Sequence, residues 1–227
     1  MIEFQSVTFD YPNGVRALFS VSFCISEGDF VFLTGPTGAG KSTIFKLIHQ
    51  QIFPTEGRIL INGYDTKYLS PKQRVALKRN MGFVFQDLKL LEDRTVFENV
   101  ALPLEICGMS KHEIHRRVSR MISLVGLSHK TYKKIDQLSC GEQQRVCIAR
   151  AVAHSPKLLL VDEPTGHLDQ TTGWEIMQIF QRIHQEGTTV VVSTHNPIWV
   201  ERMGKEVITL SGGKIVEEFP HALLLRA

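Results

Sequence analysis

The chain has 227 residues, of which 43% are hydrophobic and 22% charged, a composition typical of a globular protein with a sizeable core. Its net charge of +3 is too small to argue for a nucleic-acid partner and no dense basic run appears, so we expect none. The longest apolar runs, such as LLLV at residues 158–161, are far shorter than the ~20 residues that cross a bilayer, so we expect no membrane span.

The cysteines and histidines favour neither a disulfide framework nor a metal site. The cysteines show no metal-ligand spacing and no dense disulfide pattern; they are Cys24, Cys107, Cys140 and Cys147. No signal peptide opens the sequence, so we expect reduced thiols in a cytosolic protein. His112 and His115 are spaced to share one helical face, and we interpret them as a solvated pair.

The N-terminal part is predicted to form strands around one glycine-rich turn. Val21, Phe23 and Ile25 alternate with smaller residues, as in a half-buried strand. Residues 30–48, FVFLTGPTGAGKSTIFKLI, read as a buried strand, a turn and an amphipathic helix, which is the βα order of a nucleotide-binding unit. Residues 58–63 and 81–86 predict two further short strands.

Helical periodicity replaces the strand patterns at residues 88–156. In residues 111–127 one helical face carries the apolar residues Ile114, Val118, Met121, Ile122 and Val125, and Gly126 is well placed to end the helix. We therefore expect a single domain of residues 1–227, with a helical subdomain at 88–156 inserted into an α/β core of residues 1–87 and 157–227.

The last part of the chain returns to alternating strands and helices. Residues 157–163, KLLLVDE, read as a strand with a continuous apolar centre, as expected of a strand buried on both faces of a parallel sheet. Residues 171–187 predict a helix that ends at Gly187, and residues 188–195 predict another buried strand. Residues 207–218 predict a hairpin around Gly212 and Gly213.

The segment GPTGAGKS, residues 35–42, matches the phosphate-loop pattern G-x-x-x-x-G-K-[ST] and lies between a strand and a helix. Glycines allow the backbone N–H groups to point at phosphate oxygens. Lys41 adds a positive charge near the β and γ phosphates, and the Ser42 hydroxyl can join the shell of a Mg²⁺ ion. The alternative, a glycine-rich turn without a ligand, does not explain this context.

Three polar residues that follow strands are further candidates. Asp162 is placed to hold Mg²⁺, directly or through water, and Glu163 to polarise an attacking water. Gln86 ends the predicted strand at 81–86 and can reach a metal or a water. His195 ends the strand at 188–195, at the sheet edge where ligands bind in open α/β sheets, and favours a γ-phosphate contact. Alone, each is also compatible with an ordinary strand exit or a solvated side chain.

A second candidate anion site opens the predicted helix in QLSCGEQQRVCIARA, residues 137–151. A hydroxyl residue and a glycine lie at the helix start, where free N–H groups and the positive end of the helix dipole favour an anion. No lysine accompanies them, so this site is incomplete as a phosphate loop.

Together these residues resemble the nucleotide-binding subunit of ABC ATPases over essentially the whole chain. GPTGAGKS looks like the family's Walker A motif, LLLVDE its Walker B motif, Gln86 its Q-loop and His195 its switch histidine. LSCGEQQR at residues 138–145 resembles the family signature, and TGHLD at residues 165–169 its D-loop. Tyr11 stands where an aromatic residue stacks on adenine. A signature between the Q-loop and Walker B is highly specific.

The resemblance implies an α/β P-loop NTPase fold, with a RecA-like core, an antiparallel β subdomain and the inserted helical subdomain. It implies ATP and Mg²⁺ as cofactors, with the metal near Ser42, Gln86 and Asp162. It also implies nucleotide contacts along the whole loop, from Gly35, Pro36, Thr37, Gly38, Ala39, Gly40, Lys41, Ser42 and Thr43.

The resemblance also explains the incomplete anion site. In this family two subunits pair head to tail, so Ser139 and the Gly141 N–H would cap the γ-phosphate held by the other copy, and Asp169 would bridge to it. Two residues depart from the family pattern. Cys140 replaces a glycine, which leaves weaker closure, slower turnover and redox sensitivity open as alternatives, and His167 replaces an asparagine.

Residues 90–108 and 162–169 are similar to ABC ATPases that act with a separate membrane protein in bacterial cell division, where ATP-driven closure activates cell-wall hydrolases. This predicts a peripheral protein on the cytoplasmic face of the plasma membrane. The membrane partner is expected to dock near Gln86, unless the apolar residues there fill the insertion's own core; these are Leu88, Leu90, Leu91, Val96 and Phe97.

ATPases of lipoprotein release and of macrolide export share much of the same sequence and are the main alternative. Soluble ABC proteins that act on DNA or ribosomes carry a long coiled coil or two cassettes, and neither is seen here. A phosphate-loop kinase or GTPase leaves the signature segment without a purpose.

Overall fold

The computed structural model describes residues 1–218, which fall into two units with buried cores of their own. Unit 1 comprises residues 1–78 and the segment from residue 189 onward, and unit 2 comprises residues 79–188. Within the described residues no helix combines the length and the apolar character that a membrane crossing requires.

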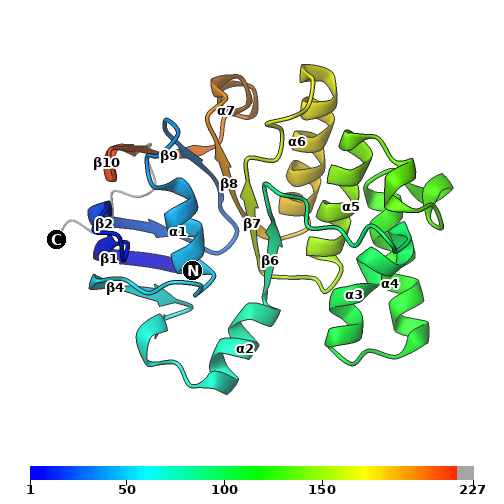
Figure 1. Cartoon of the computed structure of the whole chain (residues 1–227), viewed down its shortest axis with the longest axis horizontal. Helices are drawn as coiled ribbons and strands as arrows, with labels where there is room; N and C mark the ends of the chain where they lie inside the picture. The colour runs from blue at the N-terminus through cyan, green and yellow to red at the C-terminus, as the bar shows by residue number, and fades with distance from the viewer. Residues whose placement is uncertain (219–227) are drawn as a thin grey trace. The chain divides into compact units, whose positions relative to one another are not determined.

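One layer of unit 1 is an antiparallel sheet (Figure 1). Its order is β2-β1-β4-β5, formed by β2 (Arg16–Ile25), β1 (Ile2–Asp10), β4 (Glu56–Ile61) and β5 (Tyr64–Asp65). Phe4 of β1 pairs with Phe23 of β2 and Ile59 of β4, and the rings of Phe4 and Phe23 stack at 4.4 Å. The alternation at Val21, Phe23 and Ile25 thus turns apolar side chains into the core, as predicted.

The second sheet of unit 1 carries the strand that leads into the phosphate loop. In it β3 (Phe30–Thr34) pairs in parallel with both β8 (Thr189–Thr194) and β9 (Glu206–Ser211), and β10 (Lys214–Glu218) is antiparallel to β9. β3 and β8 are buried almost throughout, which explains their continuous apolar sequences.

Three helices belong mainly to unit 1. Helix α1 (Lys41–Ile48) follows β3 and buries the side chains of Ile44, Phe45 and Leu47. Helix α7 (Pro197–Met203) follows β8, with Asn196 as its N-cap. A 3₁₀ turn η1 (Thr66–Tyr68) leads to helix α2 (Pro71–Arg79), in which no residue is fully buried.

Unit 2 contains the parallel strand pair β6 (Met81–Val84) and β7 (Leu158–Asp162), together with helix α6 (Gln170–Gln185). Gly82 on β6 allows a close approach of helix α5 (Cys140–Val152), because a Cβ at this position would lie 2.3 Å from the carbonyl oxygen of Ala151. This packing places the C-terminal end of α5 directly against β6.

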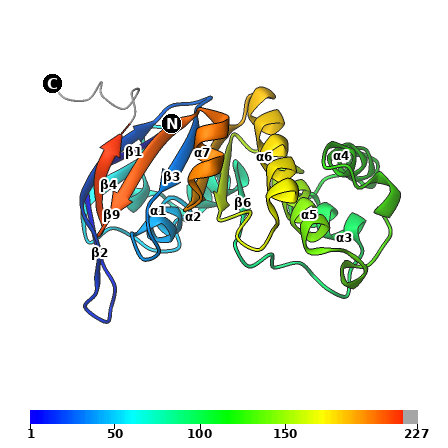
Figure 2. The ribbon, with the colours of Figure 1, turned by 90° about the horizontal axis from the view of Figure 1, so that it is seen from above.

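Helices α3 (Val96–Ile106), α4 (Lys111–Leu124) and α5 lie side by side (Figures 1 and 2). Thr95, Ser110 and Ser139 are their N-caps, each accepting a bond from the backbone N–H three residues on. Two 3₁₀ turns, η2 (Ser128–Lys130) and η3 (Ile135–Gln137), precede α5. Residues 88–156 thus contain helices and no named strand, while the division of the domain at residues 88 and 156 stays a prediction.

The predicted elements are confirmed in order and type. Gly126 and Gly187 follow α4 and α6 with φ values of +75° and +96°, which are accessible to glycine at little cost. Two strand ends were placed too late: β6 ends at Val84 and β8 at Thr194. Gln86 and His195 therefore lie in the connections after these strands, where their side chains are exposed.

Candidate functional site

The phosphate loop is shaped by three glycines in the left-handed region of backbone space. Gly35, Gly38 and Gly40 have φ values of +137°, +82° and +108°. A Cβ on Gly35 would lie 2.1 Å from the carbonyl oxygen of Leu210, so no larger residue fits there. The Gly213 N–H of the β9–β10 hairpin donates to the Ala39 carbonyl at 3.2 Å, which fixes the far side of the loop.

Lys41 folds back onto this loop. Its Nζ donates to the carbonyl oxygens of Gly35 at 2.7 Å and Pro36 at 3.2 Å, and the side chain is buried. A phosphate oxygen is a charged acceptor and forms a stronger bond to an ammonium than a neutral carbonyl does. The lysine is therefore held where an incoming phosphate can take over its hydrogen bonds. Ser42, the next residue, is exposed on the first turn of α1.

Tyr11 is attached to the same helix through Thr43. Its hydroxyl lies 3.0 Å from the Thr43 hydroxyl, its ring meets Phe9 edge-on at 4.9 Å, and the Lys46 ammonium is 5.9 Å from the ring centroid. This ring is half-buried. The structure thus brings Tyr11, Thr43 and the loop together within unit 1, the unit that also carries the exposed His195.

Unit 2 carries the acidic pair. Asp162 is the last residue of β7, and Glu163 follows it with φ = +46°, which is strained for a residue with a side chain. The carbonyl oxygen of Glu163 accepts from the Gly166 N–H at 3.3 Å and so closes the turn after the strand. Both carboxylate side chains are half-buried, and strained backbone of this kind is concentrated at functional sites.

Asp169 has a local role that the sequence interpretation did not include. It is the N-cap of α6, and its carboxylate accepts from the Thr172 N–H at 3.0 Å and from the Thr172 hydroxyl at 2.6 Å. These bonds hold the pKa of Asp169 below its ordinary value. His167, two residues earlier, is exposed.

The signature segment starts α5 with a complete capping box. The Ser139 hydroxyl accepts from the Glu142 N–H at 3.3 Å, and the Glu142 carboxylate accepts from the Ser139 N–H at 3.0 Å. Lys130 also bonds Glu142, at 2.6 Å, and this bond is the main cause of a lowered pKa of Glu142. The spacing Ser-x-x-Glu predicts the capping box, but nothing in the sequence indicates Lys130.

The capping box and Lys130 suit the helix start to an anion. The N–H groups of Cys140 and Gly141, on the first turn, have no acceptor within the helix. Glu142 would repel an anion, but Lys130 neutralises its charge at close range. Cys140 itself is exposed. The charges of Glu142 and Lys130 therefore cancel at the start of α5, and the backbone N–H groups of its first turn remain as free donors.

Gly141 joins the signature to the D-loop. A Cβ on Gly141 would lie 2.6 Å from Cγ2 of Thr172, the side chain that Asp169 holds. Only glycine leaves this contact undistorted. The structure thus brings Ser139, Gly141 and Asp169 into one packed cluster in unit 2, through a threonine that the sequence interpretation missed.

Gly141→Ala is expected to destabilise the protein by about 1–3 kcal/mol, because the new methyl group displaces Thr172 from Asp169. Within a helix the same change ordinarily stabilises by up to about 1 kcal/mol, so the sign is informative. In a Thr172→Ser background, which removes Cγ2 and keeps the hydroxyl, the destabilisation is expected to disappear. Urea unfolding of the parent, the two single variants and the double variant measures these free energies of unfolding. If the losses from the two substitutions simply add, the contact is contradicted.

Glu142→Gln is expected to lower the melting temperature at neutral pH and to weaken its dependence on acid. Because the pKa of Glu142 lies below 4.5 in the folded state, its stabilising contribution is complete above about pH 4.5 and is lost as the pH falls through the lowered value. The pair is partly exposed, so the loss is about 1 kcal/mol at most, or about 2–4 °C. Melting curves from pH 3 to 7 measure it; an identical acid profile in both proteins would contradict this role.

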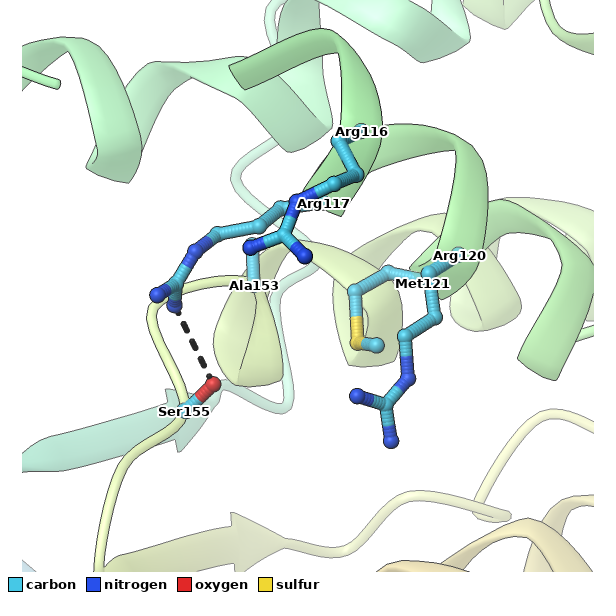
Figure 3. Close-up of a pocket in the computed structure, with 6 residues that line it drawn as sticks. All are labelled: Arg116, Arg117, Arg120, Met121, Ala153 and Ser155. Carbon is cyan, nitrogen blue, oxygen red and sulfur yellow. Dashed lines mark hydrogen bonds between the residues drawn. The ribbon is translucent and has the colours of Figure 1, made fainter. Parts of the chain in front are cut away.

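One pocket of unit 2 lies apart from these motifs (Figure 3). It has a volume of about 160 Å³ and is lined by Arg116, Arg117, Arg120, Met121, Ala153 and Ser155. Arg117 donates to the Ser155 hydroxyl at 3.3 Å. The arginines of this pocket already have carboxylate partners, since Glu113 bonds Arg116 and Arg117 and Glu186 bonds Arg120. The hydrogen bonds from the two arginines lower the pKa of Glu113 to about 2. No predicted site residue lines this pocket.

Comparison with known proteins identifies the family. Residues 18–166 match the family model described as ABC transporter. The chain is 48% identical over 218 residues to the cell division ATP-binding protein FtsE of Bacillus subtilis, covering 96% of each protein. It is 44% identical over 215 residues to the FtsE of Escherichia coli, covering 95% of this chain and 97% of that protein.

The solved structures agree with the sequence relatives. The dimeric structure of a bacterial ABC transporter cassette superposes with a TM-score of 0.87 at 39% identity, covering 96% of this chain and 97% of that one. A dimeric post-hydrolysis cassette bound to ADP and Pi gives the same TM-score of 0.87 and coverage, at 38% identity. The predicted fold class and resemblance are confirmed: the chain belongs to the ABC transporter family and is an ABC-type ATPase cassette.

Proposed function

We propose that the chain hydrolyses ATP as a head-to-tail homodimer and that this cycle drives a separate integral membrane protein of the FtsX type in bacterial cell division. The near-full-length similarity to FtsE proteins supports the process, and the dimeric cassettes among its structural neighbours support the pairing. The protein then works at the cytoplasmic face of the plasma membrane and activates cell-wall hydrolases indirectly.

The start of α5 is the observation that carries this proposal. It presents the Ser139 hydroxyl and free N–H groups, and Lys130 neutralises its acidic cap. Because Lys130 is engaged with Glu142 and residues 137–151 contain no lysine, no further lysine completes a phosphate site. An anion that arrives with its own cation satisfies such a site. ATP bound to Lys41 of a second copy meets this requirement, with Ser139 and the Gly141 N–H as donors to the γ-phosphate.

The phosphate loop and Tyr11 hold the nucleotide in its own copy. Loop N–H groups between Gly35 and Thr43 and the Lys41 ammonium bind the phosphates, and the Tyr11 ring stacks on adenine. Thr43 supports both ends of this arrangement, because it lies in the loop's helix and contacts the Tyr11 hydroxyl.

The residues proposed as metal ligands suit Mg²⁺. Ser42, Gln86 and Asp162 offer a hydroxyl, an amide and a carboxylate oxygen, the hard donors that Mg²⁺ prefers. No group of three or more His, Cys, Asp or Glu side chains able to hold a metal occurs in residues 1–218. In this proposal the phosphates of ATP supply further oxygen ligands. When bound, the ion neutralises charge that develops on the phosphates.

Glu163 is the proposed general base and His195 the proposed γ-phosphate contact. Glu163 accepts a proton from the attacking water, and His195 holds the phosphate that is released. Gln86 orients the water or the metal shell, and Asp169 bridges to the second copy. Hydrolysis then separates the copies and resets the membrane partner.

The membrane partner is proposed to dock near residues 88–97. Leu91 is 40% exposed there, whereas Val96 is fully buried and belongs to the core of the helices. The proposed docking surface therefore includes fewer than the five apolar residues named in the sequence prediction.

Mixing two inactive variants tests the shared site. Copies with Lys41→Ala and copies with Ser139→Ala are each expected to be inactive, and a mixture is expected to recover activity because each mixed pair keeps one intact pocket. No recovery, or full turnover by a demonstrated monomer, would contradict the pairing. Co-purification then identifies the partner: an FtsX-like protein supports cell division, and a lipoprotein-release or macrolide-export permease overturns it.

A further inference from the structure

The segment from Thr66 to Gln86 is one of two stretches of the chain that are rich in cations and free of carboxylates. It contains no Asp or Glu and five cations, Lys67, Lys72, Arg74, Lys78 and Arg79. The whole chain has 26 Lys and Arg against 23 Asp and Glu, so without these five it would have 21 cations against 23 anions. Residues 114–135 also contain six cations and no Asp or Glu, but four of these cations, Arg116, Arg117, Arg120 and Lys130, are paired with carboxylates of Glu113, Glu186 and Glu142. Four of the five cations of residues 66–86 lie on helix α2.

Helix α2 has one attached side and one exposed side. On the attached side, Arg74 donates to the Leu69 carbonyl at 3.2 Å and its guanidinium lies 4.7 Å from the Phe53 ring centroid, and Leu77 is half-buried. At 3.6 residues per turn, the opposite side is formed by Lys72, Val75, Ala76 and Arg79, all exposed. Figure 1 shows α2 at the margin of unit 1, apart from its two sheets.

Apolar side chains are exposed among these cations. Tyr68, in the turn before α2, is 77% exposed, Val75 is 52% exposed and Tyr64 is 60% exposed. The Lys67 ammonium lies 6.0 Å from the centroid of the Tyr68 ring, so a cation and an aromatic ring are exposed side by side. Tyrosine with lysine or arginine is the combination that lies at a membrane–water boundary, where the ring enters the headgroups and the cation reaches their phosphates.

We propose that the outer face of α2, formed by Lys72, Val75, Ala76 and Arg79, lies with Tyr68 on the anionic surface of a lipid bilayer. The face is a convex helix surface, which suits a flat, negatively charged layer that admits shallow apolar side chains. Each cation near such a surface strengthens binding roughly fivefold. This contact goes beyond the proposed function, since it requires neither ATP nor a membrane protein.

Vesicle flotation of the full chain tests the charge requirement. The protein is expected to bind vesicles of phosphatidylcholine and phosphatidylglycerol in equal parts at least about tenfold more strongly than phosphatidylcholine alone, and to dissociate as salt is raised. Lys72→Glu/Arg79→Glu is expected to weaken this binding at least about tenfold. Lys111→Glu/Lys133→Glu, an equal charge change at exposed positions of unit 2, is the matched control and is expected to bind as the parent does.

Two tyrosine variants test where the bilayer touches. Tyr68 and Tyr132 have similar exposures of 77% and 72%, but Tyr132 belongs to unit 2. The fluorescence of the parent protein, which contains Trp174 and Trp199, is subtracted from that of each variant. The remaining emission of Tyr68→Trp is expected to shift to the blue with anionic vesicles and to be quenched by brominated lipid. Tyr132→Trp is expected to do neither.

Several results would overturn the proposal: no preference for anionic vesicles, equal losses in the two charge-reversal variants, or a fluorescence response at Tyr132→Trp alone. Unchanged vesicle binding by Lys72→Glu/Arg79→Glu, with loss of a co-purifying membrane protein, would assign the face to a protein contact instead. ATP hydrolysis in the same preparations separates the two proposals, because it is expected to be unchanged by the α2 variants.

Discussion

Glu163→Gln is expected to stop turnover while leaving ATP bound, so that the protein accumulates as an ATP-bound dimer. An amide does not accept the proton of the attacking water, and loss of a general base typically slows a reaction by about 10²–10⁴-fold. Glutamine has the shape of glutamate, so the strained backbone at φ = +46° and the bond from Gly166 are retained. Phosphate release and size-exclusion chromatography with ATP measure the two effects.

Glu201→Gln is the matched control for this experiment. It makes the same chemical change at an exposed position of α7 and is expected to leave both the rate and the elution volume unchanged. Hydrolysis by Glu163→Gln at the parent rate would remove this residue from the catalytic step. If Glu163→Gln hydrolysed ATP slowly but stayed monomeric with ATP, this would instead contradict the link between hydrolysis and opening of the dimer.

Lys41→Ala is expected to weaken ATP binding by about 100-fold or more, since it removes a buried cation from the phosphate loop. The clearest measurement is thermal stability with and without nucleotide. A ligand at 100 times its dissociation constant stabilises the folded state by about 2.7 kcal/mol, and at a concentration equal to that constant by much less. ATP should therefore raise the melting temperature of the parent protein and scarcely that of the variant.

The same substitution also changes the loop itself. Without the ammonium, the carbonyl oxygens of Gly35 and Pro36 lose the donor that they have at 2.7 Å and 3.2 Å. The melting temperature without nucleotide reports this separate effect. Lys111→Ala, at an exposed position of α4, serves as the control. An equal shift by ATP in Lys41→Ala and the parent would exclude the proposed role of Lys41.

Much of the fold was predictable because its signals are local. The phosphate loop has a fixed glycine spacing between a strand and a helix, and the apolar faces of α4 and α6 repeat at helical intervals. Helix α2 gave no such signal, since it buries no residue and so needs no apolar face. The ends of β6 and β8 were placed up to two residues too late, because pairing with neighbouring strands, and not the apolar run, decides where a strand stops.

In the candidate site, too, local sequence signals were predictive and contacts made only in the folded chain were not. Lys41, Asp162 and the signature were proposed from the sequence because each belongs to a motif that is contiguous in it. Lys130 and Thr172 were missed because their importance comes from what the fold places beside them, a carboxylate in one case and the backbone of a glycine in the other. Such partners are known only after the chain has folded.

The tight fit of Gly141 against Thr172 has a consequence for how a pair of cassettes would communicate. The first turns of α5 and α6 approach each other closely at this point, so a shift of one helix start toward the other would press on it. In the proposed head-to-tail pair, both helix starts would face the nucleotide of the neighbouring copy. A structural change caused by loss of a phosphate at one pocket would then be transmitted to the second pocket through this contact, and the two pockets would act together.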